Sequence, residues 1–173
     1  PEGEDGTANT NIIFHGDKLL ALEEGHPPFE IDPFTLESIG SYNYEGKLLS
    51  PMTAHPKIDP LTGEMFAFSY GFGDNKMTYF VVDADGKLTH YSEFETPYSS
   101  MVHDFMVTSQ HVIFPVFPLV IDLEQAMMGN APITWDSKRP SYIGIMPRDG
   151  SVEDIKWIED DPCYVFHPMN AYT

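Results

Sequence analysis

The chain has 173 residues, of which 42% are hydrophobic and 13% aromatic, so it can form one ordinary domain with a real core. Its formal net charge of −18, from 27 acidic and 9 basic residues, opposes binding to nucleic acid and to anionic membrane surfaces. The longest apolar run, residues 112–121, contains two prolines and is far shorter than the roughly 20 residues that span a bilayer, so no transmembrane segment is predicted.

The two ends of the chain and its cysteine content suggest where the protein belongs. Residues 1–6 are acidic and polar where a secretory signal is basic and then apolar, and the chain does not begin with Met. It stops at Thr173, just after an apolar run. We therefore expect residues 1–173 to be a piece of a longer protein. Cys163 is the single cysteine, which excludes an intrachain disulfide and agrees with a reducing, cytoplasmic location.

Short runs rich in β-branched and aromatic residues follow one another along the chain, and each is predicted to be a strand. Asp32-Pro33, Asp59-Pro60 and Asp83-Ala84-Asp85-Gly86 are turn sequences that separate such runs. A short helix is expected at residues 123–128, because Gly129-Asn130 would end it. The expected strands are residues 11–14, 18–22, 29–31, 36–42, 65–70, 77–82, 87–94, 103–108, 111–114, 142–146, 152–157 and 164–166.

This pattern predicts an all-β chain, as a sandwich, a barrel or a propeller. Histidine spacing favours the propeller: His55 and His103 are 48 residues apart, near the roughly 40 to 50 residues of one four-stranded blade. His167 follows 64 residues after His103, which allows a blade with an insertion at residues 115–140. Because residues that start the innermost strands of successive blades point at the central axis, three blades would bring three imidazoles to one place.

Neutral imidazole is a common protein ligand for zinc, copper and iron. A metal site formed by His55, His103 and His167 is one interpretation, and three packed core histidines are the other. An all-histidine site is expected to need a neighbouring carboxylate that accepts the second ring N–H, and Glu23 and Glu24 are candidates.

Other residues are assigned plainer roles. Asp104 would face away from His103 in a regular strand. The remaining histidines lie in or beside polar turns and are expected at the surface: His15, His26, His90 and His111. The apolar residues 112–121 are predicted to be core, and residues 114–118 are alternatively the lining of an apolar substrate tunnel.

Six short motifs occur in order along the chain, and together they resemble the carotenoid cleavage oxygenase family, which includes the bacterial lignostilbene dioxygenases. The similarity runs through nearly all of the chain but covers only part of a complete family member. The motifs are Asn9-Thr10-Asn11, Leu20-Ala21-Leu22-Glu23-Glu24-Gly25, Thr53-Ala54-His55-Pro56, Val102-His103-Asp104-Phe105, Pro147-Arg148-Asp149-Gly150 and Phe166-His167-Pro168-Met169-Asn170-Ala171.

The resemblance implies part of a seven-bladed β-propeller, with about three blades in residues 1–173 and the C-terminal blades absent. It also implies a non-haem Fe(II) held by four histidines. Enzymes of this kind use O2 to split a conjugated C=C bond of an apolar substrate into two carbonyl products. By position, His55, His103 and His167 match the first three iron ligands, whereas the fourth would lie beyond residue 173. Glu24 matches a glutamate that orients the second of these histidines, and Thr10 matches a threonine whose methyl group crowds a vacant iron position.

One departure bears on the substrate. Members that cleave 4-hydroxystilbenes tend to carry lysine where this chain has Glu23, and a carboxylate there would repel a phenolate. An apocarotenoid or another conjugated apolar molecule is therefore also an alternative substrate. Two other functions remain as alternatives: a metal-free, propeller-like binding or scaffold module, and a zinc hydrolase with three histidines and water. Because an incomplete propeller leaves strand edges open, residues 1–173 are not expected to be stable alone.

Overall fold

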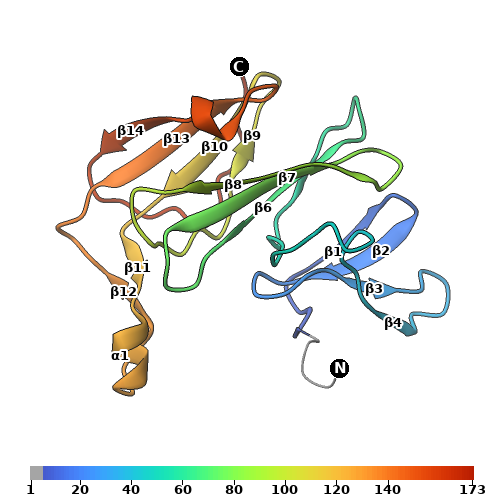
Figure 1. Cartoon of the computed structure of the whole chain (residues 1–173), viewed down its shortest axis with the longest axis horizontal. Helices are drawn as coiled ribbons and strands as arrows, with labels where there is room; N and C mark the ends of the chain where they lie inside the picture. Colours follow the sequence, from blue (N-terminus) through green and yellow to red (C-terminus); the bar gives the residue numbers. More distant parts are fainter. Residues whose placement is uncertain (1–5) are drawn as a thin grey trace. The chain divides into compact units, whose positions relative to one another are not determined.

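Three four-stranded sheets contain most of the regular structure of residues 6–173, the part of the chain that the computed structural model describes (Figure 1). In each sheet, strands that follow one another in the chain and belong to the sheet are neighbours, as in a propeller blade. The first sheet is antiparallel, has the order β1-β2-β3-β4 and consists of β1 (Asn11–His15), β2 (Lys18–Leu22), β3 (Phe29–Ile31) and β4 (Ser38–Ser41).

The second and third sheets repeat this pattern. The second has the order β5-β6-β7-β8, with β5 (Lys57–Ile58), β6 (Met65–Tyr70), β7 (Lys76–Val82) and β8 (Leu88–Glu95). The third has the order β14-β13-β10-β9, with β9 (Met106–Val107), β10 (His111–Val116), β13 (Ser141–Pro147) and β14 (Lys156–Asp160). Three such sheets confirm the prediction of an all-β chain with about three blades.

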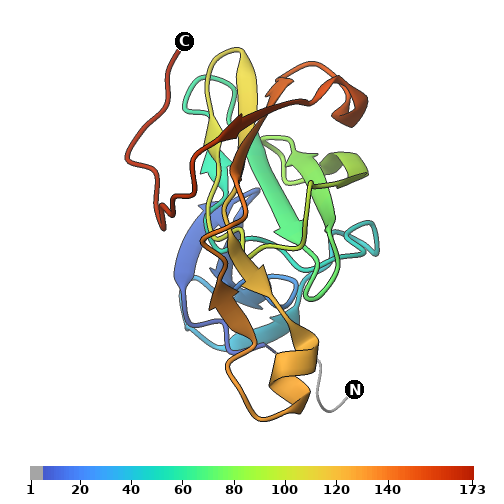
Figure 2. The ribbon, with the colours of Figure 1, turned by 90° about the vertical axis from the view of Figure 1, so that its left-hand side faces the viewer.

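The predicted insertion in the last blade is a small hairpin that carries a helix (Figure 2). Strands β11 (Leu119–Ile121) and β12 (Ile133–Trp135) come between β10 and β13 in the sequence and pair antiparallel with each other. Helix α1 (Leu123–Met127) connects them. Asp122 caps the helix, since its carboxylate accepts from the backbone N–H groups of Glu124 and Gln125. The short helix was predicted from its Gly-Asn end, whereas the hairpin beneath it was not.

Aspartates at the predicted turns make the backbone contacts that such turns need. Asp32 Oδ1 accepts from the N–H of Thr35 at 2.8 Å, Asp59 Oδ1 from that of Leu61 at 2.8 Å, and Asp83 Oδ1 from that of Lys87 at 2.8 Å. These side chains replace backbone partners in the turn, and so they fix where each strand ends.

The chain divides into two compact units, and each has its own buried residues. Unit 1 comprises residues 1–69 and 78–92, and unit 2 comprises residues 70–77 and 93–173. Leu20, Met52 and Phe80 are among the fully buried side chains of unit 1. In unit 2, Phe105 stacks on Phe114, with ring centroids 6.2 Å apart and both side chains fully buried.

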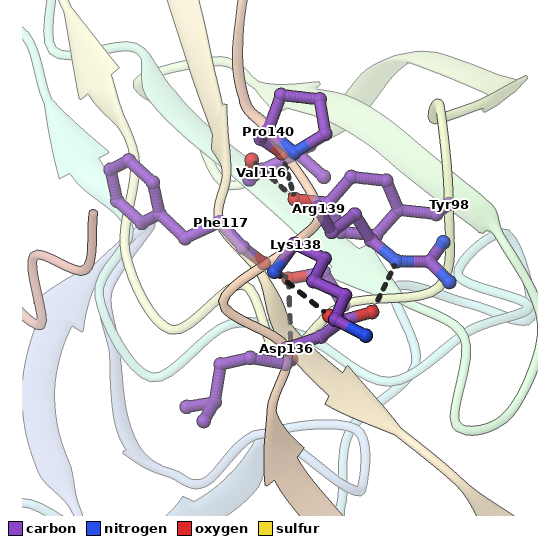
Figure 3. A network of polar contacts seen from close by, with 9 residues as sticks. Tyr98, Val116, Phe117, Asp136, Lys138, Arg139 and Pro140 are labelled. Carbon is purple, nitrogen blue, oxygen red and sulfur yellow. Dashed lines mark hydrogen bonds and ion pairs between the residues drawn. The ribbon is translucent and has the colours of Figure 1, made fainter. Parts of the chain in front are cut away.

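A polar network in unit 2 holds the loop that follows β12 (Figure 3). The Tyr98 hydroxyl donates to the carbonyls of Val116 and Pro140, at 3.2 and 2.8 Å. Arg139 lies over the Tyr98 ring, with its guanidinium carbon 4.8 Å from the ring centre, and its Nε donates to Asp136 Oδ2 at 3.3 Å. The insertion is thereby tied back to β10 and β13.

Three sequence predictions about strands were wrong. Only residues 106–107 of the expected strand 103–108 pair, because Met101 N–H donates to the Leu119 carbonyl and Asp104 accepts from Phe105 N–H instead. Residues 152–154 form a 3-10 turn, capped by Ser151 and Asp154, before the strand begins at 156. Residues 164–166 are not a strand: they lie between two prolines, which cannot donate to a ladder.

Candidate metal centre

His103 and His167 come together in unit 2, although they are 64 residues apart in sequence. Their Nε2 atoms are 3.1 Å apart, and the ring planes make an angle of 67°. Imidazole nitrogens bind a first-row metal at roughly 2.0–2.1 Å, so two ligands at right angles on one ion would be about 3 Å apart. The separation of these two nitrogens therefore fits adjacent ligands of a single metal ion.

The backbone on both sides of His103 is anchored. Met101 N–H donates to the Leu119 carbonyl at 2.9 Å, and the neighbouring Val102 and Asp104 side chains are buried. Asp104 Oδ1 accepts from the Phe105 N–H at 2.8 Å, so this carboxylate has a local structural contact, as expected from its position beside His103. The imidazole itself is half-buried, and its place is fixed by residues on either side.

Burial lowers the pKa of His103, and the positive charge of a protonated His167 lowers it further, whereas Asp104 raises it. The net direction is down, so the neutral imidazole is favoured at neutral pH. A metal ligand must offer a lone pair, and a neutral histidine does so without first losing a proton. The electrostatics of His103 thus suit it to be a ligand.

Aromatic rings hold His167 beside its partner. The Phe166 ring lies 4.1 Å from the His103 ring between centroids, and Tyr164 packs edge-on against Phe166 and Phe117 at 5.9 and 5.8 Å. His167 follows this cluster in an irregular segment and is itself exposed. Phe166 was not predicted to be a support for the histidines, although its position directly before His167 was a signal for that role.

His55 lies in unit 1, just before β5, in a segment that hydrogen bonds anchor. Its backbone N–H donates to Thr53 Oγ1 at 3.0 Å, and Asn11 Nδ2 donates to the Ala54 carbonyl at 2.8 Å. Thr53 and Ala54 are buried, and the His55 side chain is half-buried. The direction of its backbone is therefore well defined, and its role as a metal ligand stays a prediction.

Thr10 and Glu24 lie at the two ends of one hairpin in unit 1. Thr10 N–H donates to the Leu22 carbonyl at 3.0 Å, and its exposed hydroxyl donates to Asn9 Oδ1 at 3.1 Å. Glu24 is half-buried in the turn after β2, where strand alternation no longer applies. The roles predicted for these two residues stay predictions.

Glu23, beside Glu24, is held by its own turn. Its carboxylate contacts the His26 ring and accepts from the Gly25 N–H at 2.7 Å. No lysine or arginine pairs with it among the ion pairs of the described residues. This position is therefore acidic and locally fixed by an imidazole and a backbone amide.

The surface prediction for the remaining histidines was wrong for His15, which is only 8% exposed. Its Nε2 lies 2.8 Å from the Gly63 carbonyl, a contact across 48 residues that local turn signals cannot reveal. His26, His90 and His111 are half-buried. His90 packs against the Tyr79 ring at 5.5 Å, which is a structural contact and not part of the candidate site.

Known proteins are similar to this chain over nearly its whole length. The family profile described as "Retinal pigment epithelial membrane protein" matches residues 2–173. An isoeugenol monooxygenase of Pseudomonas putida is 45% identical over 99% of the chain and 37% of its own length. Carotenoid cleavage oxygenase 1 of Neurospora crassa is 43% identical over 96% of the chain and 32% of its own length.

A solved structure gives the same result for the fold. The lignostilbene dioxygenase of Pseudomonas brassicacearum superposes with a TM-score of 0.85 and 40% identity, over 91% of this chain and 34% of that one. The chain therefore spans about a third of the length of the proteins that it matches. Within residues 6–173, the helices lack the length and hydrophobicity that a membrane-spanning helix needs.

Proposed function

We propose, from the premise that this chain belongs to the retinal pigment epithelial membrane protein family, that the complete protein is a non-haem Fe(II) dioxygenase. It would use O2 to cleave a conjugated C=C bond of an apolar small molecule into two carbonyl products. The observation that carries this proposal is the His103–His167 pair, with ring nitrogens 3.1 Å apart. Relatives named as carotenoid and lignostilbene oxygenases support the reaction class.

Iron would be held by His55, His103 and His167, each of which can offer one ring nitrogen. A fourth histidine would come from outside residues 1–173. An all-nitrogen site suits a divalent first-row metal, and bound Fe(II) would supply O2 activation. We further propose that the Glu24 carboxylate accepts the second ring N–H of His103, which would fix the tautomer that binds the metal. The Thr10 methyl group would narrow access to one iron position.

The substrate class follows from the acidic turn at Glu23. A carboxylate held by His26 and Gly25 offers no cation to a phenolate. A 4-hydroxystilbene would therefore bind less well than a neutral conjugated substrate. An apocarotenoid or a stilbenoid without an ionised phenol is the substrate that this position favours.

Metal analysis tests the proposal most simply. Full-length protein prepared with ferrous iron is expected to retain iron and to consume O2 when given a stilbene or an apocarotenal, with product masses that match two carbonyl fragments. The His55→Ala and His103→Ala double variant should lose iron and turnover, whereas His90→Ala, outside the set, should keep both. Full iron occupancy in the double variant would contradict the proposal.

The same preparation separates the two alternatives. A protein that binds no metal when iron is supplied would be the scaffold module, with histidines that serve only in packing. One that binds zinc and turns over without O2 would be a hydrolase. Each result would replace the dioxygenase proposal.

Residues 1–173 would then be one part of a single propeller domain, completed by blades from the rest of the protein. The isolated chain should accordingly fail to show a sharp, reversible thermal transition, and such a transition would count against this assignment. The single, exposed Cys163 supports a reducing compartment, the cytoplasm, and cell fractionation would test that location.

A further inference from the structure

A cavity of about 330 Å³ in unit 1 is lined by three lysines, Lys18, Lys47 and Lys87. The chain has only 9 basic residues against 27 acidic ones. Three of those nine basic residues thus line one small cavity, although the chain as a whole is strongly acidic. Two tyrosines, Tyr42 and Tyr44, line it as well.

Close contact between two turns brings two of these lysines to the cavity. Gly16, in the β1–β2 turn, lies so near Gly86, in the β7–β8 turn, that a Cβ on Gly16 would overlap the Gly86 Cα. Both glycines have positive φ, of 55° and 82°, which other residues rarely adopt. Lys18 and Lys87 follow these turns directly, so the backbone contact fixes the spacing of their attachment points.

The three ammonium groups differ in how far the protein neutralises them. Lys18 Nζ lies 2.6 Å from Glu30 Oε1 and 4.7 Å from the centre of the Tyr42 ring, so it is a fixed cation. Lys47 Nζ is 3.8 Å from Glu45 Oε2, a loose and exposed pair. Lys87 is exposed and has no ion pair with the described residues. Lys47 and Lys87 are therefore the groups free to turn toward a ligand.

Acidic groups at the cavity limit what it can hold. Glu45 and Asp85 also line it, so the lining alone carries one net positive charge, and Glu30 beside Lys18 offsets that charge. A weakly charged anion gains little from such a site. A compact dianion, which two or three ammonium groups can contact at once, gains most, because lysine binds phosphate groups as a point charge.

Tyr44 holds a buried hydroxyl in the wall beside the cavity. It lines the cavity, is 3% exposed, and its hydroxyl has no hydrogen-bond partner among the described residues. Burial, and to a lesser extent Tyr42, raises the pKa of Tyr44, so the hydroxyl stays protonated. Its backbone is in the left-handed region, with φ of 52°, which is unusual for a bulky residue. A buried donor without a partner is uncommon, and because this hydroxyl is closed to solvent, the Tyr44 ring would have to shift before a ligand oxygen could reach it.

We propose that this cavity is a binding site for a small anion of the phosphate class, either free phosphate or a phosphomonoester. Its volume lies at the lower end of the roughly 300–1,000 Å³ of small-molecule sites, which suits one phosphoryl group with little attached. The ligand is polar and doubly charged, unlike the apolar substrate proposed above. The site is therefore a second function of unit 1, independent of any iron chemistry.

Isothermal titration of the full-length protein with inorganic phosphate and with phenyl phosphate tests this directly. Both are expected to bind, and the Lys47→Gln and Lys87→Gln double variant should weaken binding by about tenfold or more, since charge-assisted hydrogen bonds are lost. Lys76→Gln, which removes the same charge from an exposed residue outside the cavity, is the control and should change affinity little. Tyr44→Phe should weaken binding less than the double variant.

The two ligands distinguish the source of the phosphoryl group. Tighter binding of phenyl phosphate supports a phosphomonoester as ligand, and equal or weaker binding supports free phosphate. Unchanged affinity in the double lysine variant, equal binding of acetate, or no binding of either phosphate would each overturn the site. Unchanged thermal unfolding of the variants shows that any loss is local.

Discussion

The histidine pair of unit 2 and the lysine cavity of unit 1 are built in opposite ways. His103 is half-buried against aromatic rings, and burial lowers its pKa, so it is kept neutral with a lone pair to give. Lys47 and Lys87, by contrast, are exposed beside the cavity. Burial of His103 favours the neutral imidazole, which can bind a metal cation. Exposed ammonium groups beside the lysine cavity can instead contact an anion.

The largest effect is expected when an imidazole of the histidine pair is removed. His103→Ala in the full-length protein is expected to lower iron affinity and O2-dependent turnover by more than about a hundredfold. Loss of a group that only orients a metal ligand costs up to about a hundredfold, and loss of the ligand itself should cost more. Iron content by mass spectrometry and O2 uptake measure this. Phosphate binding in the same variant should be unchanged, and a parallel loss would show that the two sites are not independent.

Removal of the ring beside the pair should have a smaller effect of the same kind. Phe166 lies against His103 at 4.1 Å, and Phe166→Ala would leave both ring nitrogens present but less firmly placed. Iron affinity should fall by about tenfold or more, as for other groups that orient a ligand. Competition with a metal chelator measures it. Phe34→Ala, at a side chain that is 93% exposed, is the matched control and should leave affinity unaltered.

Salt should separate the two sites further. Phosphate binding at Lys47 and Lys87 depends on exposed charges. It should weaken by severalfold to about tenfold when ionic strength rises from about 0.05 to 0.5 M, because added salt shortens the Debye length and screens the attraction. Iron retention depends on short bonds from neutral ligands and should be unaffected. Calorimetry and metal analysis at the two ionic strengths measure this, and iron loss at high salt would be inconsistent with an imidazole site.

The smallest effect is expected at the network of Figure 3. The backbone N–H of Lys138, and then the Arg139 side chain, hold the Asp136 pKa below its ordinary value of 3.8. The unfolded chain therefore binds a proton more readily, and the contribution of Asp136 to stability is present above pH 3.8 and lost as pH falls through the folded pKa. Urea unfolding of the full-length Asp136→Asn variant should show a weaker acid dependence than that of the full-length parent. An identical acid dependence would mean that these contacts do not lower the Asp136 pKa.

Features that depend on local chemistry were predictable from the sequence. Asp32, Asp59 and Asp83 mark turns because each side chain bonds to backbone only a few residues away. The hairpin of β1 and β2 and the four-stranded repeat follow from such turns together with strand periodicity. His103 and His167 were paired by spacing and by family resemblance, and the structure brings their nitrogens together.

Features set by distant contacts were missed. The burial of His15 depends on a carbonyl at Gly63, and the lysine cavity depends on the contact between Gly16 and Gly86. Residues 164–166 have strand-like composition but are held by the aromatic contacts of Tyr164 and Phe166 in place of a ladder. Composition and periodicity do not show which loops contact each other, because those contacts depend on how the distant strands pack.

X-ray absorption at the iron edge of the full-length, iron-loaded protein tests the central proposal, an all-histidine iron site, most directly. The expected spectrum has nitrogen as the first coordination shell, with the outer-shell scattering of several imidazole rings, and this scattering should diminish in His167→Ala. A first shell with sulfur, a spectrum without imidazole scattering, or no change on removal of His167 would contradict the assignment of these histidines as iron ligands.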